Sequence, residues 1–540
     1  MSIFIPLLRF GINTRQIIMK KEVEIVILPD DIYNPDKIFS EILKQSAVKQ
    51  KELKHYSIRK RSIDARGKQV LYRLKVVLYI NEEPGLETFT INYPSVKDEQ
   101  PVLVIGAGPA GLFAALRLIE LGLKPIIIER GKDVKQRRRD LAAINKEGII
   151  NPESNYCFGE GGAGTYSDGK LYTRSNKRGD VNKMLQVFVD HGADEDILLD
   201  ARPHIGTNKL PHIISAIRET ILNAGGEVYF NTKLVDIDVK GNEVRAAITD
   251  KGKIEAKALI LATGHSARDI YEILHTKGIK VEGKAFALGV RIEHPQEIID
   301  QAQYHCEVRH ENLPPSYYSL VEQVGGRGVF SFCMCPGGIV APCATDYNEI
   351  VVNGWSPSKR NNPYANSGTV VQINLEDVKG SLDNPFAMLD FQRQIEQKAF
   401  VAGGGKLKAP AQRMVDFVNR KFSTDLPKNS YLPGLSSTDL HEILPDFVAN
   451  SLAKALPLFG KKMPGRFGNH GYFTNEAVLV GVESRTSSPI RIPRDKESLQ
   501  HPQIKGLFPC AEGAGYAGGI ISAAIDGQVC ADGVYKLIKG

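Results

Sequence analysis

The sequence predicts an α/β fold: a discontinuous parallel-sheet domain, an α+β domain inserted into it, and a small α+β module before it. Three observations predict this fold. Residues 102–128 have the pattern of strand, glycine turn, helix and strand, whereas residues 506–538 have that of strand, glycine turn and helix. The long segment between them mixes strands with capped helices, one expected from Pro385 to Gly403 and another starting near Ser437, and repeats neither unit.

The first glycine turn carries the pattern of a dinucleotide site. The residues that we expect around the pyrophosphate are Gly106, Gly108, Pro109, Ala110 and Gly111. The first glycine permits the tight turn, the second lets the backbone approach the phosphates, and the third lets the helix pack closely on the strand. The helix N-terminus then faces the phosphate charge. A glycine turn that only packs a helix on a sheet is the alternative.

The second strand of this unit, residues 125–128, ends on an acid, Glu129. A carboxylate at this place accepts hydrogen bonds from an adenosine ribose, so FAD is the expected cofactor. We assign Arg130 to the same site. One of five following cations is expected to reach the pyrophosphate or the ribose: Lys132, Lys135, Arg137, Arg138 and Arg139.

Residues 155–170 are rich in glycine, which permits close backbone approach to a ligand. We expect Gly161, Gly162 and Thr165 to contact the cofactor. A mobile surface loop is the alternative, although three aromatic residues in the segment argue against it.

Further along, a helix near residues 212–221 precedes expected strands at 227–239, 243–249 and 253–261, and the last ends in Ala262-Thr263-Gly264. This order resembles the two-dinucleotide-binding-domain flavoproteins of the glutathione reductase and p-hydroxybenzoate hydroxylase superfamily. The resemblance implies that Thr263 and Gly264 lie over the FAD pyrophosphate and that the backbone near Val235 contacts the adenine.

The same resemblance extends to the end of the chain. It implies that Glu512, in place of the usual Asp, and Gly513 hold the ribityl chain. It also implies that the helix starting after Gly519, at Ile520, directs its N-terminus at the pyrimidine end of the flavin. About half a positive charge at that terminus would stabilise the anionic reduced flavin. A glycine-rich helix packing contact is the alternative.

Six longer motifs are similar to those of a bacterial family of uncharacterised FAD-dependent dehydrogenases: FGEGGAGTYSDGKL, ALILATGHSARDIY, FALGVRIEHP, VFSFCMCPGG, GVESRTSSP and GLFPCAEGAGYAGGIISAAIDG. This resemblance covers residues 20–540 and supplies no substrate. The chain lacks the CxxxxC pair of the disulfide reductases and a second nucleotide fold for NAD(P)H, so that activity is not expected.

We expect a module at 20–98, the FAD-binding domain at 99–269 and 501–540, and a substrate or cap domain at 270–500. Within the module we expect a strand at 22–29, a helix at 36–48 and a hairpin of 52–66 with 70–81. Residues 1–18 fit an upstream extension of the reading frame, because Met19 directly precedes a clear strand.

Four residues of the inserted domain are candidates for catalysis: Arg291, Cys333, Cys335 and Arg485. Either arginine could orient an anionic substrate, but Arg291 fits a solvated or ion-paired residue better. The two cysteines share one face of an expected strand and could exchange electrons with the flavin, attack a substrate, or be buried and inert.

The composition, with 42% hydrophobic and 24% charged residues, is that of a globular protein. Seven cysteines without a CxxC pair or ligand-like spacing fit a reducing cytoplasm and predict no metal. No apolar stretch is long enough for a membrane span. Nine cations against two acids between residues 44 and 68 fit a solvated face better than a nucleic-acid patch, because no RNA-binding aromatic motif accompanies them.

These observations predict an FAD-dependent oxidoreductase that transfers a hydride between a small organic substrate and the flavin. The electron donor or acceptor is external, with NAD(P)H as one candidate. An FAD-dependent hydroxylase and a flavoprotein that binds RNA or another polyanion are the alternatives.

Overall fold

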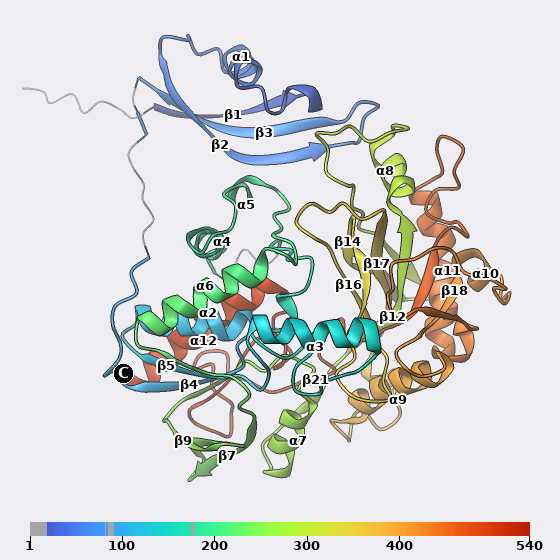
Figure 1. The fold of residues 1–540 in the computed structure, drawn as a ribbon. Helices are drawn as coiled ribbons and strands as arrows, with labels where there is room; N and C mark the ends of the chain where they lie inside the picture. Colours follow the sequence, from blue (N-terminus) through green and yellow to red (C-terminus); the bar gives the residue numbers. More distant parts are fainter. Residues whose placement is uncertain (1–18, 82, 85–90, 174–178) are drawn as a thin grey trace, which may run out of the picture. The chain divides into compact units, whose positions relative to one another are not determined.

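The computed structural model describes residues 19–81, 83–84, 91–173 and 179–540 (Figure 1). The chain divides into two compact units, residues 1–90 and residues 91–540. Residues 1–18, which we interpreted as an extension of the reading frame, lie outside the described part. No helix that the model describes is both long and apolar enough to cross a membrane.

The first unit is an antiparallel sheet of order β1-β3-β2 with one α-helix. Its elements are β1 (Met19–Ile27), η1 (Pro29–Asp31), α1 (Pro35–Ser46), β2 (Leu53–Asp64) and β3 (Leu71–Ile80). The side chain of Asn34 accepts hydrogen bonds from the first amides of α1 and so fixes its start. The predicted strand, helix and hairpin of this module are confirmed.

The second unit contains the predicted parallel sheet. Within the described residues its five strands run in the order β22 (Leu507–Pro509), β10 (Leu259–Leu261), β4 (Pro101–Ile105), β5 (Lys124–Ile128) and β6 (Glu227–Tyr229). All neighbouring pairs are parallel. Because β22 comes from the end of the chain, the Rossmann-like domain is discontinuous, as predicted.

Helices cover one face of this sheet (Figure 1). They include α2 (Pro109–Glu120), α6 (Leu210–Asn223) and α12 (Ile520–Lys539), and further helices of the domain are α3 (Val134–Glu147), η2 (Gly162–Gly164), α4 (Val181–Asp190), α5 (Asp196–Leu199) and α7 (Arg268–Thr276). A side chain at Gly527 of α12 would come within 2.1 Å of the carbonyl oxygen of Ala110, so glycine sets the close approach of α12 to α2.

The opposite face packs against an antiparallel sheet of β7 (Leu234–Lys240), β8 (Glu243–Thr249) and β9 (Gly252–Glu255). The predicted single strands at 227–239 and 253–261 are wrong, because each divides between the two sheets. At the first break Asn231 has φ +50° and its amide bonds to Gly131, which turns the chain away from β6.

The inserted domain is built on a sheet whose described strands run β13 (Val321–Val324), β14 (Arg327–Cys335), β17 (Tyr364–Ile373), β12 (Phe286–Pro295), β20 (Val478–Glu483), β18 (Ala409–Arg413) and β19 (Leu435–Ser437). Two short antiparallel pairs are separate from it: β11 (Glu282–Gly283) with β21 (Ile490–Arg491), and β15 (Ile339–Pro342) with β16 (Val352–Trp355).

Its helices are α8 (Gln296–Tyr304), η3 (Leu375–Asp377), α9 (Ala387–Ala402), α10 (Met414–Val418), η4 (Leu440–Glu442) and α11 (Asp446–Lys462). The predicted helix at 385–403 begins two residues late, after Phe386. The predicted start near Ser437 is wrong, because Leu435–Ser437 pairs with β18 as an edge strand and the helix begins only after Pro445.

Candidate functional site

A cavity of about 650 Å³ opens at the carboxyl ends of β4, β5 and β10. Twelve of the predicted cofactor residues line it: Gly106, Gly108, Pro109, Ala110, Glu129, Arg130, Gly162, Thr263, Gly264, Glu512, Gly519 and Ile520. The sequence places these residues far apart in four segments. The parallel sheet brings them together because all its strands end at one edge.

Bare backbone faces this cavity at three glycines. The nearest atom to a side chain added at Gly108 would be the Cα of Gly162, at 3.9 Å. A side chain added at Gly264 or Gly519 would have no neighbouring atom within 4 Å. Gly108 and Gly519 are also the N-caps of α2 and α12, and no side chain caps either helix. Two helix N-termini and open space beside glycine backbone fit a bound dinucleotide.

Glu129 is buried and organises the cavity wall. Its Oε2 accepts a 2.9 Å hydrogen bond from the amide of Ala107, and its Oε1 accepts from the amides of Gly131 and Gly159. A carboxylate can accept about four hydrogen bonds, so Oε2 retains capacity for a ribose hydroxyl. Glu129 thus connects three loops by hydrogen bonds, and it also lines the cavity where the ribose is expected.

Five predicted cofactor residues do not line the cavity: Gly111, Gly161, Thr165, Val235 and Gly513. A side chain at Gly111 would lie 1.9 Å from the carbonyl oxygen of Gly106, which agrees with its predicted packing role. Thr165 is buried, donates to the carbonyl of Glu160, and contacts Gly161 within the loop. Val235 points to solvent with 42% exposure, and Leu234 lines the cavity instead.

The predicted contact from the basic cluster is wrong, since none of its five cations lines the cavity. Arg137 is fully buried and donates to the carbonyls of Asn155, Tyr156 and Glu160. It therefore holds the glycine-rich segment in shape. Arg130 does line the cavity, and its guanidinium binds both carboxylate oxygens of Asp269.

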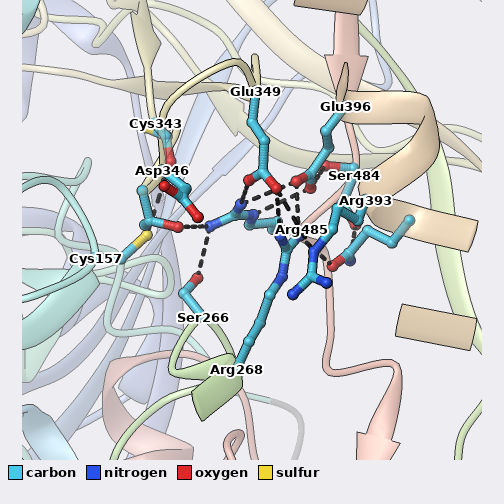
Figure 2. Close-up of polar contacts among 12 residues, drawn as sticks. Cys157, Ser266, Arg268, Cys343, Asp346, Glu349, Arg393, Glu396, Ser484 and Arg485 are labelled. Atoms are coloured by element: carbon cyan, nitrogen blue, oxygen red, sulfur yellow. Dashed lines mark hydrogen bonds and ion pairs between the residues drawn. The ribbon is translucent and has the colours of Figure 1, made fainter. Parts of the chain in front are cut away.

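The structure assigns Arg485 a different role from the predicted one (Figure 2). Its Nε and Nη2 donate to Glu396, Nη2 also donates to Glu349, and Nη1 donates to the hydroxyls of Ser266 and Thr345. A guanidinium has five N–H donors, and all five are used. Arg485 lines the cavity, but it has no donor left for an anionic substrate.

Arg268 completes this buried charge cluster by donating to Glu349 and Glu396. Burial opposes ionisation of Glu396, but Arg485 and Arg268 overcome it and hold its pKa below the ordinary value. Burial and the neighbouring Glu396 raise the pKa of Glu349. Two arginines and two carboxylates thus join α9 and the loop after β20 to the start of α7.

Arg291 is also excluded from direct substrate contact. It is fully buried, pairs with Glu483 at 3.0 Å, and uses its remaining donors on Asn353, Asn366 and the Cys333–Cys335 turn. Burial raises the pKa of Glu483 to about 7. The ion-pair alternative for Arg291 is therefore the one that the structure supports.

The two cysteines do not lie on a regular strand as predicted. The pairing of β14 with β17 shifts between Phe332 and Cys335, and Cys333 has φ +46°. The bend thus falls at the cysteines themselves rather than at the following Pro336-Gly337-Gly338. Cys333 lines the cavity, whereas Cys335 is fully buried.

Sequence reasoning missed the charged residues beside these thiols. Asp168 and Lys170 both line the cavity, and Asp168 pairs with Arg360 at 2.7 Å. They lie within the glycine-rich segment of residues 155–170. The sequence did contain a signal for them, because Asp168 and Lys170 place two opposite charges inside a segment that is expected to face the ligand.

A second group that sequence spacing did not reveal is buried where the residue after β22 meets α12. Cys510, Asp526 and Cys530 offer ligand atoms within 4.8 Å of one another. The guanidinium of Arg494 already contacts both carboxylate oxygens of Asp526 and, at 3.3 Å, the sulfur of Cys530. A protein cation therefore fills the place that a metal ion would take.

Comparisons with known proteins agree with the fold and the cavity. A family model described as an FAD binding domain matches residues 99–266, and one described as an FAD-dependent protein, C-terminal domain-like, matches residues 285–486. A domain of unknown function matches residues 19–79. The class that the fold and the site define is thus that of FAD-dependent oxidoreductases.

An uncharacterized protein of Clostridium beijerinckii is 40% identical over 94% of this chain and 97% of its own length, and the chain belongs to the same family. A D-amino acid dehydrogenase of Helicobacter pylori is 35% identical over 68 residues, which are 13% of this chain and 16% of that protein.

Solved structures similar to this chain include CtdE in complex with FAD, with 11% identity, a TM-score of 0.33, and coverage of 82% of this chain and 85% of that one. Glycine oxidase from Bacillus cereus has 13% identity, a TM-score of 0.29, and coverage of 81% and 95%. These scores are too low to support an argument about function.

Proposed function

We propose that the protein is a dehydrogenase or reductase that passes a hydride between a small organic substrate and FAD. The observation that supports this proposal is the shared wall of the cavity. Phe332, Cys333, Asn353, Thr486 and Ser487 of the inserted domain line the same cavity as the dinucleotide turn. A substrate held by the inserted domain would therefore lie next to the cofactor.

FAD, when bound, supplies reversible hydride acceptance. The chain's own contribution is binding, electrostatics and exclusion of water. The uncapped N-terminus of α12 favours negative charge beside Ile520. Glu512 lines the same wall, with its Oε1 3.5 Å from Nδ1 of His265.

The inserted domain supplies small polar groups rather than a charged clamp. Both of its candidate arginines have all their donors occupied, so recognition falls to Asn353, Thr486 and Ser487, which line the cavity. We infer that the substrate is small, with polar groups that accept or donate single hydrogen bonds. The external electron partner is a diffusible molecule, NAD(P)H among the candidates.

The test is anaerobic mixing of the FAD-bound protein with separate panels of amines, amino acids, hydroxy acids and nicotinamide nucleotides, followed by visible flavin absorbance. Bleaching by a substrate, with recovery of a product two electrons more oxidised, supports the proposal. The same reaction under oxygen separates the alternatives. A product that gains an oxygen atom from O₂ identifies a hydroxylase and contradicts the proposal.

A further inference from the structure

Two cysteines and one lysine meet at the cavity wall. The Nζ atom of Lys170 lies 3.7 Å from the sulfur of Cys333 and 3.6 Å from the sulfur of Cys335. The thiol of Cys335 also donates to the carbonyl oxygen of Cys333 at 3.3 Å. Both cysteines are free thiols, and only Cys333 faces the cavity.

The turn that carries the thiols is held in an uncommon shape. Alternate residues of a regular strand lie about 6.6 Å apart, near the upper limit for a disulfide. Here the bulge and the positive φ of Cys333, a backbone conformation that is strained in residues other than glycine, gather both sulfurs around the ammonium group of Lys170. Arg291 fixes this turn through the carbonyl of Cys333, at 2.7 Å, and the sulfur of Cys335, at 3.5 Å.

The charges around the thiols leave a positive excess. Three cations, Lys170, Arg291 and Arg360, face two carboxylates, Asp168 and Glu483. One thiolate would balance the one positive charge that remains.

The protonation of two of the surrounding groups bears on this excess: Glu483 is only partly charged and so enlarges it, whereas His204 is neutral and leaves it unchanged. Burial raises the pKa of Glu483 to about 7, so its negative charge is incomplete near neutral pH. Burial and Arg360 lower the pKa of His204 to about 4, so His204 is neutral there.

The two thiols are unequal. The neighbouring thiol of Cys335 holds the pKa of the Cys333 thiol well below its usual range, and Lys170 and Arg291 add to this effect against burial. The neighbouring Cys333 side chain and burial raise the pKa of Cys335. In addition, Oδ1 of Asp168 is buried at the cavity wall without a hydrogen-bond partner, which leaves an acceptor for a ligand.

We propose that Cys333 and Cys335 form a redox-active dithiol that exchanges with small-molecule disulfides entering the cavity, with Cys333 as the attacking thiolate and Cys335 as the resolving thiol. This activity goes beyond hydride transfer and does not depend on it. The sulfurs come from β14 of the inserted domain, and the lysine comes from the segment between η2 and α4 of the FAD-binding domain.

The reaction balances without a further reactant. The Cys333 thiolate attacks one sulfur of a disulfide RSSR, the RS–SR bond breaks, RS⁻ leaves, and a mixed disulfide forms between Cys333 and the remaining RS group. The Cys335 sulfur then attacks the sulfur of Cys333 and releases the second RS⁻, while the Cys335 proton ends on one of the two thiolates. The dithiol loses two electrons, and RSSR becomes RSH and RS⁻. A small thiol reverses the reaction.

The first test is alkylation of the FAD-bound full-length protein with limiting iodoacetamide between about pH 5.5 and 9, read by peptide mass spectrometry. Cys157 is the matched control, because it is half-buried and lines the same cavity. Cys333 should react at least about tenfold faster than Cys157 at pH 6.5, because a thiol whose pKa lies well below the ordinary value of about 8.5 is still thiolate at that pH. Equal rates and equal pH profiles would overturn the proposal.

Lys170 gives a second readout that is independent of turnover. Lys170→Met should move the Cys333 alkylation profile to higher pH, whereas Lys170→Arg should retain the wild-type profile because the positive charge is kept. The visible absorbance of each variant reports its FAD content, so loss of cofactor is seen separately from loss of thiol reactivity. An unchanged profile in Lys170→Met contradicts the assigned role of the lysine.

The decisive test uses hydroxyethyl disulfide on the reduced holoprotein. The wild type should lose the mass of two hydrogens and yield a peptide linked between Cys333 and Cys335. Cys335→Ser should stop at a stable adduct on Cys333, and Cys333→Ser should form no adduct on this turn. If the wild type gives no linked peptide, or if the adduct forms on Cys335, the dithiol proposal fails while the FAD proposal stands.

Discussion

At the residue scale, the buried arginines of the inserted domain are structural. Arg291 and Arg485 each direct all five donors at groups of the chain itself, so neither can also bind an anion without breaking an existing bond. Breaking a buried ion pair by removing one partner costs about 3–5 kcal/mol. These arginines therefore hold the side chains and loops of the cavity wall in place and do not bind the substrate.

Glu293 on β12 gives a residue-scale prediction of pH dependence. Its buried carboxylate accepts hydrogen bonds from the amide and hydroxyl of Ser430, and burial raises its pKa to about 7. A folded-state pKa above the unfolded value of about 4.3 means that stability falls as pH rises from about 4.5 to about 7. Ionisation of this buried group thus costs the folded state about 3 kcal/mol at high pH.

Glu293→Gln should be close to the wild type in melting temperature at pH 5 and more stable than it at pH 8. Thermal unfolding at the two pH values measures this. Glu297→Gln is the control, because Glu297 is exposed one turn further along the chain. A stability difference of the same size at both pH values would refute the role given to Glu293.

At the element scale, α9 is joined to the FAD-binding domain through Glu396. The carboxylate accepts hydrogen bonds from Arg268, Ser484 and Arg485 and is fully buried. Glu396→Ala would leave two guanidinium groups sharing Glu349. We expect a loss of about 3–5 kcal/mol in the free energy of unfolding.

Chemical denaturation of the Glu396→Ala protein measures this loss, with two matched variants beside it. Glu396→Gln should lose less, because an amide oxygen still accepts a hydrogen bond. Arg393→Ala, on the same helix with ion-pair distances of 3.9 Å and 35% exposure, should change stability by at most about 1 kcal/mol. A Glu396→Ala protein as stable as Arg393→Ala would show that the cluster does not couple the two domains.

The elements of the parallel sheet could be predicted because local pattern decides them. Buried strands, glycine turns and helix periodicity appear within a few residues of each other, as in residues 102–128. Strand breaks such as that at Asn231 could not be predicted, because they arise from bonds to a loop about a hundred residues away. The pairing of Arg485 with Glu349 and Glu396 is equally non-local, so sequence alone left the guanidinium open for a substrate.

At the scale of the whole molecule, the N-terminal unit carries a local excess of cations over acids between residues 44 and 68. Some of its cations are paired within the unit, as Arg66 and Arg73 are with Asp64, while Lys54 and Lys60 are exposed. We expect these lysines to be solvated. Binding of single-stranded RNA, measured by fluorescence anisotropy, should therefore be absent at about 0.15 M salt.

A steep decrease of RNA affinity with salt, weakened further by Lys54→Glu and Lys60→Glu, would support the polyanion alternative instead. The matched control is charge reversal at Lys251 and Lys257, which are exposed in the FAD-binding domain. Equal effects of both pairs would indicate only a response to net charge.

The central claim is that the cavity at the end of β4 holds the FAD pyrophosphate against Gly108. This position has φ −75° and ψ −178°, which any residue adopts, and its side chain would enter open space. Gly108→Val should therefore fold with wild-type stability but obstruct the phosphates.

The measurement is FAD affinity by titration of the apoprotein, with thermal unfolding of the same apoprotein as the folding control. We expect an apoprotein of unchanged melting temperature whose Kd for FAD rises about a hundredfold, as an overpacked contact of ~3 kcal/mol requires. A Gly108→Val protein that purifies fully yellow, with unchanged FAD affinity, would contradict the account.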